Sequence, residues 1–293
     1  MSEIDFSDRD YINREYSPSS CIDDINVYIQ QYIQLSNIAK NHAFEQNLLH
    51  RNIQYGERKT QSLDLYLPIG HPQNKLMVYI HGGYWQELSK EESSFAATNF
   101  QQQGFHFAVI DYTLAPDASI TDIVEENRNA IAWLYQHAAQ FSYKPQEIYV
   151  SGSSAGAHLA MMMLQTNWSE YVIDCQENII KGVCAVSGIY DLQPLLPTYV
   201  NELLSMDLRE AKTNSPVLQA LPKPAPVIIA FGENETREFK RQSKIMRDKL
   251  CSEGFDVQFE EIKGRNHFDV IIDLSEKSTW LSQQTIKLMN STE

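Results

Sequence analysis

The chain has 293 residues, long enough for one large domain with a full core, and its 43% hydrophobic content excludes wholesale disorder. Its formal net charge of −14 argues against nucleic acids and anionic membranes as partners, because both would repel it. The longest apolar runs have the length of strands and fall well short of a membrane span. We therefore expect a globular protein with no nucleic-acid or membrane partner.

Strand-like and helix-like segments alternate along most of the chain. After an N-terminal helix expected over 21–44, strands are expected at 53–55, 63–67, 76–80, 105–110, 147–150, 182–187, 227–231 and 257–262, the first two of them antiparallel. Helices are expected at 91–103, 121–140, 155–166, 236–253 and 276–290. Such alternation predicts an α/β fold with a mostly parallel sheet and helices on both faces.

We interpret residues 1–293 as a single domain with two additions to its core. One is an N-terminal helical extension at about 20–45, and the other is a proline-rich stretch at about 192–226, interpreted as a small cap or lid. The four cysteines are scattered, with no C-x-x-C pair and no zinc spacing, so we expect reduced thiols and no bound metal. The acidic start lacks the basic-then-apolar order of a secretory peptide, which favours a cytoplasmic location.

The segment 149–157 carries the most specific chemical signal, because it places Ser154 between Gly152 and Gly156 in a G-x-S-x-G pattern. An apolar strand-like run precedes the pattern, and a run with the composition of a buried helix follows it. A sharp strand-to-helix turn holds a serine in a strained backbone conformation with its hydroxyl exposed, and the glycines avoid collisions within the bend. Ser154 is therefore the candidate nucleophile.

A serine nucleophile needs a general base, and histidine is the usual one near neutral pH. In the fold that uses this turn, an acid and then a histidine follow the serine along the chain. Only His158 and His267 follow Ser154. His158 lies four residues on in the same rigid helix, which keeps its ring from meeting the hydroxyl correctly. His267, in a glycine-containing loop after a strand, is therefore the predicted base.

The acid is expected after a strand that lies between the serine and the histidine in the sequence. Glu235 is the first candidate, because it comes three residues after Gly232, at the end of the strand expected at 227–231. Asp191, after the preceding strand, is the alternative, and a helix or turn cap would explain it as well. Glu233 fits a solvated turn residue.

The strand expected at 76–80 runs into His81-Gly82-Gly83-Tyr84-Trp85. Two glycines after a strand allow backbone N–H groups to point into a cavity, where they can stabilise the negative oxygen of a tetrahedral intermediate. An HGG loop ahead of a G-x-S-x-G turn is the arrangement of lipases and esterases. The two motifs together predict a serine hydrolase. His81 itself is interpreted as a structural hydrogen-bonding residue of the loop.

The same loop resembles the H-G-G-x-W motif of the kynurenine formamidases, or arylformamidases, a family of the α/β-hydrolase superfamily. The resemblance covers about residues 10–275, with further agreement at 13–19, 187–192, 232–239, 242–243 and 266–269. It implies an α/β-hydrolase fold, with Ser154 as nucleophile and His267 as base. It also implies an oxyanion hole formed by the N–H groups of Gly83, Tyr84 and Ala155. Formamidases usually carry aspartate at the position of Glu235, and glutamate is an accepted alternative in this fold.

The resemblance implies hydrolysis of an aryl formamide, N-formyl-L-kynurenine, to L-kynurenine and formate, without a cofactor. Tyr84, Trp85 and Phe268 are the candidate substrate-binding residues, and packing beneath the loop would explain Trp85 equally well. A carboxylesterase acting on small esters or other amides is an alternative. A non-catalytic ligand-binding protein on a hydrolase scaffold is another, disfavoured by the retained serine, acid and histidine. We expect a small molecule as the binding partner and a homodimer as the candidate assembly.

Overall fold

In the computed structural model, which describes residues 8–173, 175, 178–221 and 224–291, eight strands form one sheet. Their order is β1-β2-β4-β3-β5-β6-β7-β8. The strands are β1 Leu49–Gln54, β2 Ser62–Tyr66, β3 Leu76–Ile80, β4 His106–Ile110, β5 Ile148–Ser153, β6 Ile180–Val186, β7 Val227–Asn234 and β8 Val257–Asn266. β2 is antiparallel to β1 and to β4, and every other pair is parallel. The expected mostly parallel sheet is confirmed, as is its antiparallel start.

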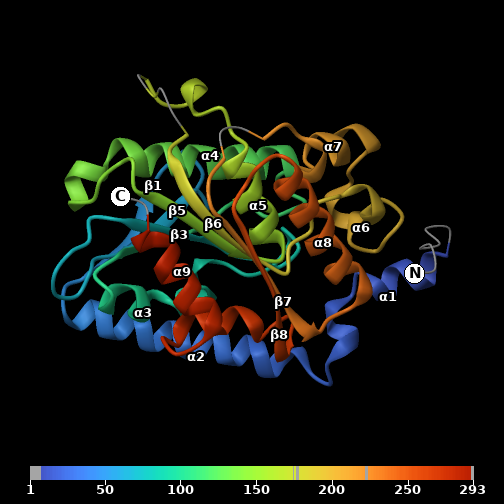
Figure 1. Cartoon of the computed structure of the whole chain (residues 1–293), viewed down its shortest axis with the longest axis horizontal. Coiled ribbons are helices and arrows are strands. Elements are labelled where there is room, and N and C mark those ends of the chain that lie inside the picture. The colour runs from blue at the N-terminus through green and yellow to red at the C-terminus, as the bar shows by residue number, and fades with distance from the viewer. Residues whose placement is uncertain (1–7, 174, 176–177, 222–223, 292–293) are drawn as a thin grey trace.

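Helices cover both faces of this sheet (Figure 1). They are α1 Arg9–Glu15, α2 Ile25–Glu45, α3 Ala97–Gln102, α4 Ile120–Gln136, α5 Ala155–Leu164, α6 Asn201–Leu204, α7 Leu208–Thr213, α8 Arg237–Ser252 and α9 Trp280–Asn290. Buried side chains of α4, α5 and α8 belong to one hydrophobic core, and those of α2, α3 and α9 to a second core. The sheet therefore separates two cores, as an α/β fold requires.

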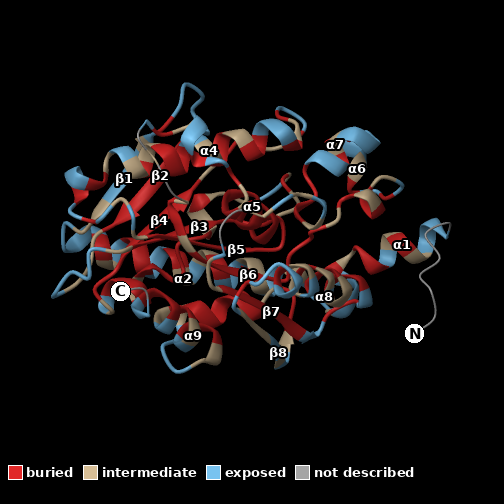
Figure 2. Cartoon of the chain, turned by 45° about the horizontal axis from the view of Figure 1, so that its top comes forward, coloured by how far each residue is buried: buried red, intermediate tan, exposed pale blue. Residues whose placement is uncertain are grey.

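β3 contributes side chains to both hydrophobic cores. Leu76, Val78 and Ile80 belong to the core that contains α5, whereas Met77 and Tyr79 belong to the core that contains α2 and α9. All five residues are buried, and Figure 2 shows the same for the neighbouring central strands. Side chains alternate between the two faces of a strand, so a strand covered on both faces is apolar throughout.

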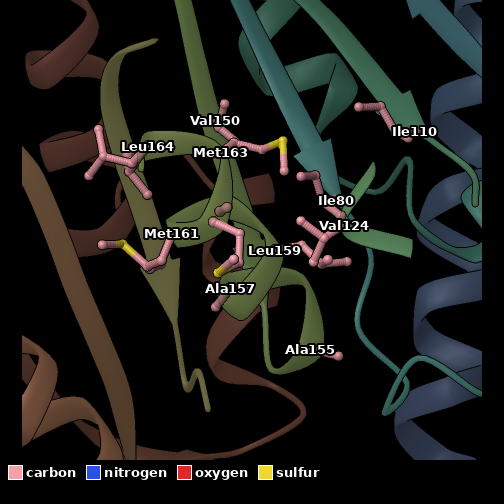
Figure 3. Close-up of a cluster of buried hydrophobic side chains, with 14 of the residues drawn as sticks. Ile80, Ile110, Val124, Val150, Ala155, Ala157, Leu159, Met161, Met163 and Leu164 are labelled. Carbon is pink, nitrogen blue, oxygen red and sulfur yellow. The ribbon is translucent and has the colours of Figure 1, made fainter. Parts of the chain in front are cut away.

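α5 is buried along its whole length. Figure 3 shows its side chains, among them Leu159 and Met163, beside Ile80 and Val150 of the sheet and Val124 of α4. Close packing of this kind leaves little room for the helix to shift. The residue just before α5 is therefore held at a fixed position relative to β3 and β5.

Several boundaries differ from those expected. The helix expected at 91–103 is shortened to α3, because a 3-10 turn at Lys90–Glu92 takes the first residues. The last helix starts at Trp280, where the side chain of Thr279 caps it by accepting from the Ser282 N–H. β1 begins at Leu49, four residues before the expected strand, since Asn52, with φ of 54°, interrupts the alternation within it.

The two additions to the core consist of helices of very different length. α2 in the N-terminal extension has 21 residues, whereas the described part of the stretch expected to form a cap contains α6, α7 and two 3-10 turns. Within the described residues, no helix combines the length and the apolar character needed to cross a bilayer. The role of the stretch 192–226 as a lid stays a prediction.

Candidate active site

Ser154 occupies a sharp turn between the end of β5 and the start of α5. Its φ of 58° and ψ of −119° lie outside the regions that residues with a Cβ prefer, and such strain concentrates at functional sites. The flanking glycines are required by close backbone contacts. A Cβ at Gly152 would lie 2.3 Å from the Gly156 carbonyl oxygen, and one at Gly156 would lie 2.0 Å from that of Ile80.

The turn lies where the strand order reverses. β3 has β4 on one side and β5 on the other, so the loops after β3 and β5 diverge and leave a crevice at their carboxyl ends. Ser154 follows β5, and the HGG loop follows β3. A Cβ at Gly82 would lie 3.4 Å from the Ser154 Cβ and 2.7 Å from the Ser153 carbonyl oxygen. The loop backbone therefore lies directly against the serine turn.

The proposed acid and base follow two neighbouring strands. β7 and β8 are parallel, and their register pairs Asn234 with Asn266. The next residues, Glu235 and His267, therefore leave the sheet side by side. His267 Nδ1 lies 3.0 Å from Glu235 Oε2, and both side chains are buried. Because a carboxylate only accepts, the proton of the neutral ring belongs on Nδ1, which leaves Nε2 as the basic nitrogen.

The second carboxylate oxygen of Glu235 is held by two further donors. Oε1 accepts from Ser187 Oγ at 2.6 Å and from the Gly232 N–H at 2.5 Å. Ser187 follows β6 directly and has a φ of 52°. Ser187 had no predicted role, although it is the first residue of the segment 187–192, which agrees with the formamidase pattern. With three donors on one buried carboxylate, the acid has a single fixed orientation.

The other two acidic candidates have structural partners. Asp191 Oδ1 accepts from the backbone N–H and the side-chain amide of Gln193, each at 3.1 Å, as a turn cap does. Glu233 is exposed, and its Oε2 accepts from the Gly264 N–H at 2.9 Å. The structure thus pairs Glu235, and not Asp191, with His267.

The HGG loop coils tightly, with φ values of 92°, 52° and 60° at Gly83, Tyr84 and Trp85. A Cβ at Gly83 would lie 2.2 Å from the Glu87 carbonyl oxygen, so glycine is required there. Among the hydrogen bonds of the described residues, none uses the N–H of Gly83, Tyr84 or Ala155 as donor. Unsatisfied N–H groups beside a serine turn are suited to hold a developing oxyanion.

His81, the first residue of this loop, makes buried contacts that hold it in place. The residue is buried, its ring stacks on Tyr112 with centroids 4.1 Å apart, and its Nδ1 lies 2.9 Å from the Gly82 carbonyl oxygen. The Tyr112 hydroxyl donates to the His81 carbonyl at 3.0 Å. These contacts fit the structural role that the sequence suggested for His81.

One cavity of about 280 Å³ contains both Ser154 and His267 in its wall. Within the described residues, no hydrogen bond joins the two side chains, and such bonds are often long before substrate binds. Aromatic side chains in the wall come from Tyr32, Tyr79, Tyr84, Phe95, Tyr199 and Phe268. The N-terminal extension adds Ile25 and Ile29, and the segment just before it adds Pro18 and Ser19. Two of the candidate substrate-binding residues, Tyr84 and Phe268, thus lie where a substrate would contact them.

The expectation that Trp85 contacts the substrate is wrong. Its side chain is fully buried in the core that contains α5 and does not line the cavity. Its ring meets that of His158 edge to face, with centroids 5.1 Å apart. The left-handed backbone of the loop turns Trp85 away from the cavity and into the core.

His158, on α5, is expected to make stability depend on pH. Burial lowers its pKa from 6.5 to about 4, although its Nε2 bonds to the Asn214 carbonyl at 2.7 Å. Between those values the unfolded chain binds a proton that the folded protein does not. The free energy of unfolding should therefore fall by up to about 1.4 kcal/mol per pH unit as pH drops from 6.5 toward 4.

The variant His158→Gln isolates this contribution, because glutamine can still donate to the Asn214 carbonyl. Urea unfolding at several pH values from 7 to about 4 should show wild type losing its stability relative to the variant as pH falls. A constant difference between the two proteins over this range would rule out a neutral buried imidazole.

Comparisons with known proteins agree with this geometry. A family model described as BD-FAE matches residues 63–250. The chain is similar to the kynurenine formamidases of Danio rerio and Salmo salar, at 34% and 35% identity, with 99% of both chains covered in each case. It is also similar to a solved structure from Silicibacter sp. TM1040, a thioesterase candidate, with 27% identity and a TM-score of 0.82. That match covers 96% of this chain and 99% of the other. The chain therefore matches the BD-FAE family and belongs to the kynurenine formamidase family of α/β-hydrolase enzymes.

Proposed function

We propose that this enzyme hydrolyses N-formyl-L-kynurenine to L-kynurenine and formate through a Ser154–His267–Glu235 triad. The observation that carries the proposal is the 3.0 Å contact between His267 Nδ1 and Glu235 Oε2, in a cavity that Ser154 also lines. The names of the zebrafish and salmon relatives support a formamide as the substrate.

In the first step, Ser154 Oγ attacks the formyl carbon and its proton passes to His267 Nε2. Glu235, held by its three donors, keeps the ring oriented and stabilises the positive charge that forms on it. The carbonyl electrons move onto oxygen, and the N–H groups of Gly83, Tyr84 and Ala155 are suited to stabilise that charge.

Collapse of this intermediate breaks the bond between the formyl carbon and the anilide nitrogen. His267 gives its proton to the departing nitrogen, which leaves as the free aryl amine, and the formyl group stays on Ser154 as an ester. Water, deprotonated by His267, then attacks this ester. The proton on His267 returns to Ser154, and formic acid leaves and loses its proton to solvent as formate. An anilide nitrogen leaves more readily than that of an alkyl amide, which suits a site of esterase type.

The cavity wall fits the aromatic half of such a substrate. Phe268 follows the base directly, and its ring lies 5.3 Å from that of His267. Tyr84, which follows the loop glycines, and Tyr32 also line this cavity. Aromatic faces bind a flat aryl group by stacking and by apolar burial.

Steady-state kinetics on N-formyl-L-kynurenine beside a series of p-nitrophenyl esters tests the proposal. We expect the formamide to give the highest kcat/KM, and the esters to lose about 10-fold or more for each step beyond acetyl, because a site that accepts a formyl group has little need of room for a longer acyl chain. Esters with long acyl chains that react fastest would instead identify a carboxylesterase. Failure of both turnover and fluorophosphonate labelling would identify a non-catalytic binding protein.

A further inference from the structure

Glu15 and Tyr16, at the end of α1, contact two segments next to the active site, which are the start of α8 and the HGG loop. Both residues are buried, with exposed fractions of 8% and 0%. Figure 1 shows α1 beside α8, at the edge of the molecule. They belong to the segment 13–19, which matched the formamidase pattern without any assigned role.

Glu15 caps α8, the helix that starts two residues after Glu235. Glu15 Oε2 accepts from the backbone N–H groups of Arg237 and Glu238, at 2.9 and 3.3 Å. The carbonyl of Glu15 accepts from Thr236 Oγ1 at 2.5 Å, and Thr236 makes no side-chain cap of its own. The first N–H groups of a helix have no partner within it, and a carboxylate there is favoured by the helix dipole. The cap of α8 therefore comes from a residue 222 positions earlier in the chain.

Tyr16 extends this contact toward the base. Its hydroxyl donates to Glu238 Oε2 at 2.8 Å and accepts from Gln242 Nε2 at 2.9 Å, so it bonds to the first two turns of α8. Its ring lies 6.2 Å from that of Phe239, and the Phe239 ring in turn lies 4.3 Å from the ring of His267. The packing of the base thus depends on the same helix turn.

Tyr16 also holds the loop that would form the oxyanion hole. Its backbone carbonyl accepts from the Tyr84 hydroxyl at 2.6 Å. Tyr84 lies in the left-handed part of the HGG loop, where φ is 52° and the N–H has no partner among the described residues. Anchoring the side chain fixes the backbone that carries this N–H, and a misplacement of about 1 Å at a reacting centre can lower a rate by about 100-fold.

We propose that Glu15 and Tyr16 are positioning residues for the reaction. Glu15 fixes the start of α8, and with it Glu235 and His267, while the Tyr16 carbonyl fixes the oxyanion loop through Tyr84. The inference rests on the proposed triad, and it is independent of which acyl substrate the enzyme takes. The tests therefore use p-nitrophenyl acetate turnover and fluorophosphonate labelling of Ser154.

Glu15→Ala and Glu15→Gln test the contact with α8, with Asp10→Ala as the control. Asp10 is an exposed carboxylate on the same helix, so its removal changes the charge of α1 without touching α8. We expect Glu15→Ala to lower kcat by about 10-fold per labelled active site, with KM changed less than about 2-fold. The acidic limb of its pH–rate profile should move to lower pH, because a loosened carboxylate stabilises the protonated imidazole less. Glu15→Gln, which keeps an accepting oxygen, should recover most of the rate.

Tyr84→Phe tests the contact with the oxyanion loop, with Tyr143→Phe as the control. The Tyr143 hydroxyl is also buried and donates to a backbone carbonyl, that of Leu134 at 2.5 Å, but Tyr143 does not line the cavity. Tyr84→Phe should lower kcat by about 10-fold and leave the pH limb in place, because the acid and base are untouched. Tyr143→Phe should keep the wild-type kcat per labelled site, even if its stability falls.

Counting active sites by fluorophosphonate labelling separates positioning from folding. Wild-type kcat per labelled site in both Glu15→Ala and Tyr84→Phe, or an equal fall in Tyr143→Phe, would overturn the proposal and leave the triad standing. If Glu15→Ala does not fold, the comparison of Tyr84→Phe with Tyr143→Phe still decides whether the contact with the oxyanion loop positions the reaction. A wild-type protein that neither labels nor turns over would overturn the proposed function itself.

Discussion

Replacing Ser154 by alanine is expected to lower kcat for N-formyl-L-kynurenine by about 10⁴- to 10⁶-fold. Without its hydroxyl no acyl-enzyme can form, and only binding and the oxyanion donors remain to accelerate direct attack by water. The fold should persist, because alanine at a φ of 58° is strained in the same way as serine. Ser154→Gly should be more stable than Ser154→Ala by about 1 kcal/mol, since glycine adopts this conformation without strain.

The measurement combines kcat, fluorophosphonate labelling and thermal unfolding of the purified variants. Ser151→Ala is the matched control, because Ser151 is a buried serine on the same strand that does not line the cavity. Ser151→Ala should keep kcat within a few-fold of wild type. If Ser154→Ala retained wild-type turnover and labelling, another residue would have to be the nucleophile.

Much of this site could be predicted from the sequence because two of its parts are local. The G-x-S-x-G turn and the HGG loop each depend on backbone contacts within a few residues or between two adjacent strands, and glycine marks those contacts directly. Chain order left His158 and His267 as candidates for the base, and the position of His158 in the helix that follows Ser154 favoured His267. The acid followed from its spacing after Gly232, and the physical basis is that β7 and β8 end in register at Asn234 and Asn266.

Other features depend on the direction in which a side chain points, and short sequence patterns do not predict that direction. Trp85 lies in the core because its loop has positive φ, and an aromatic residue gives no sign of such a backbone. Ser187 bonds to a glutamate 48 residues later, and Glu15 caps a helix 222 residues later. Such contacts are set by how distant elements pack, so they become visible only once the fold is known.

Glu235→Gln is expected to lower kcat by about 10⁴-fold, because it reverses the polarity of the contact that orients the base. The native carboxylate accepts on both oxygens, from His267 on one and from Ser187 and Gly232 on the other. A glutamine must place its amino group on one side. If the amino group faces His267, it can only donate to Nδ1, so Nδ1 must lose its proton and the ring proton moves to Nε2. Nε2 then cannot accept the proton of Ser154. Facing Gly232, the amino group leaves a buried donor unpaired, at a cost of about 1–3 kcal/mol.

Two further variants are compared with Glu235→Gln: Glu235→Asp, which keeps the charge, and Glu233→Gln, which serves as the control. Aspartate keeps the charge and is the residue that the formamidase pattern carries here, but it shortens the side chain by one methylene. We expect kcat to fall about 10- to 100-fold, since a carboxylate too far from Nδ1 orients the ring loosely. Glu233→Gln removes an exposed carboxylate two residues away and should leave kcat near wild type. Wild-type kcat in Glu235→Gln would show that the base needs no acid at this position, and Asp191→Asn would then be the variant to measure.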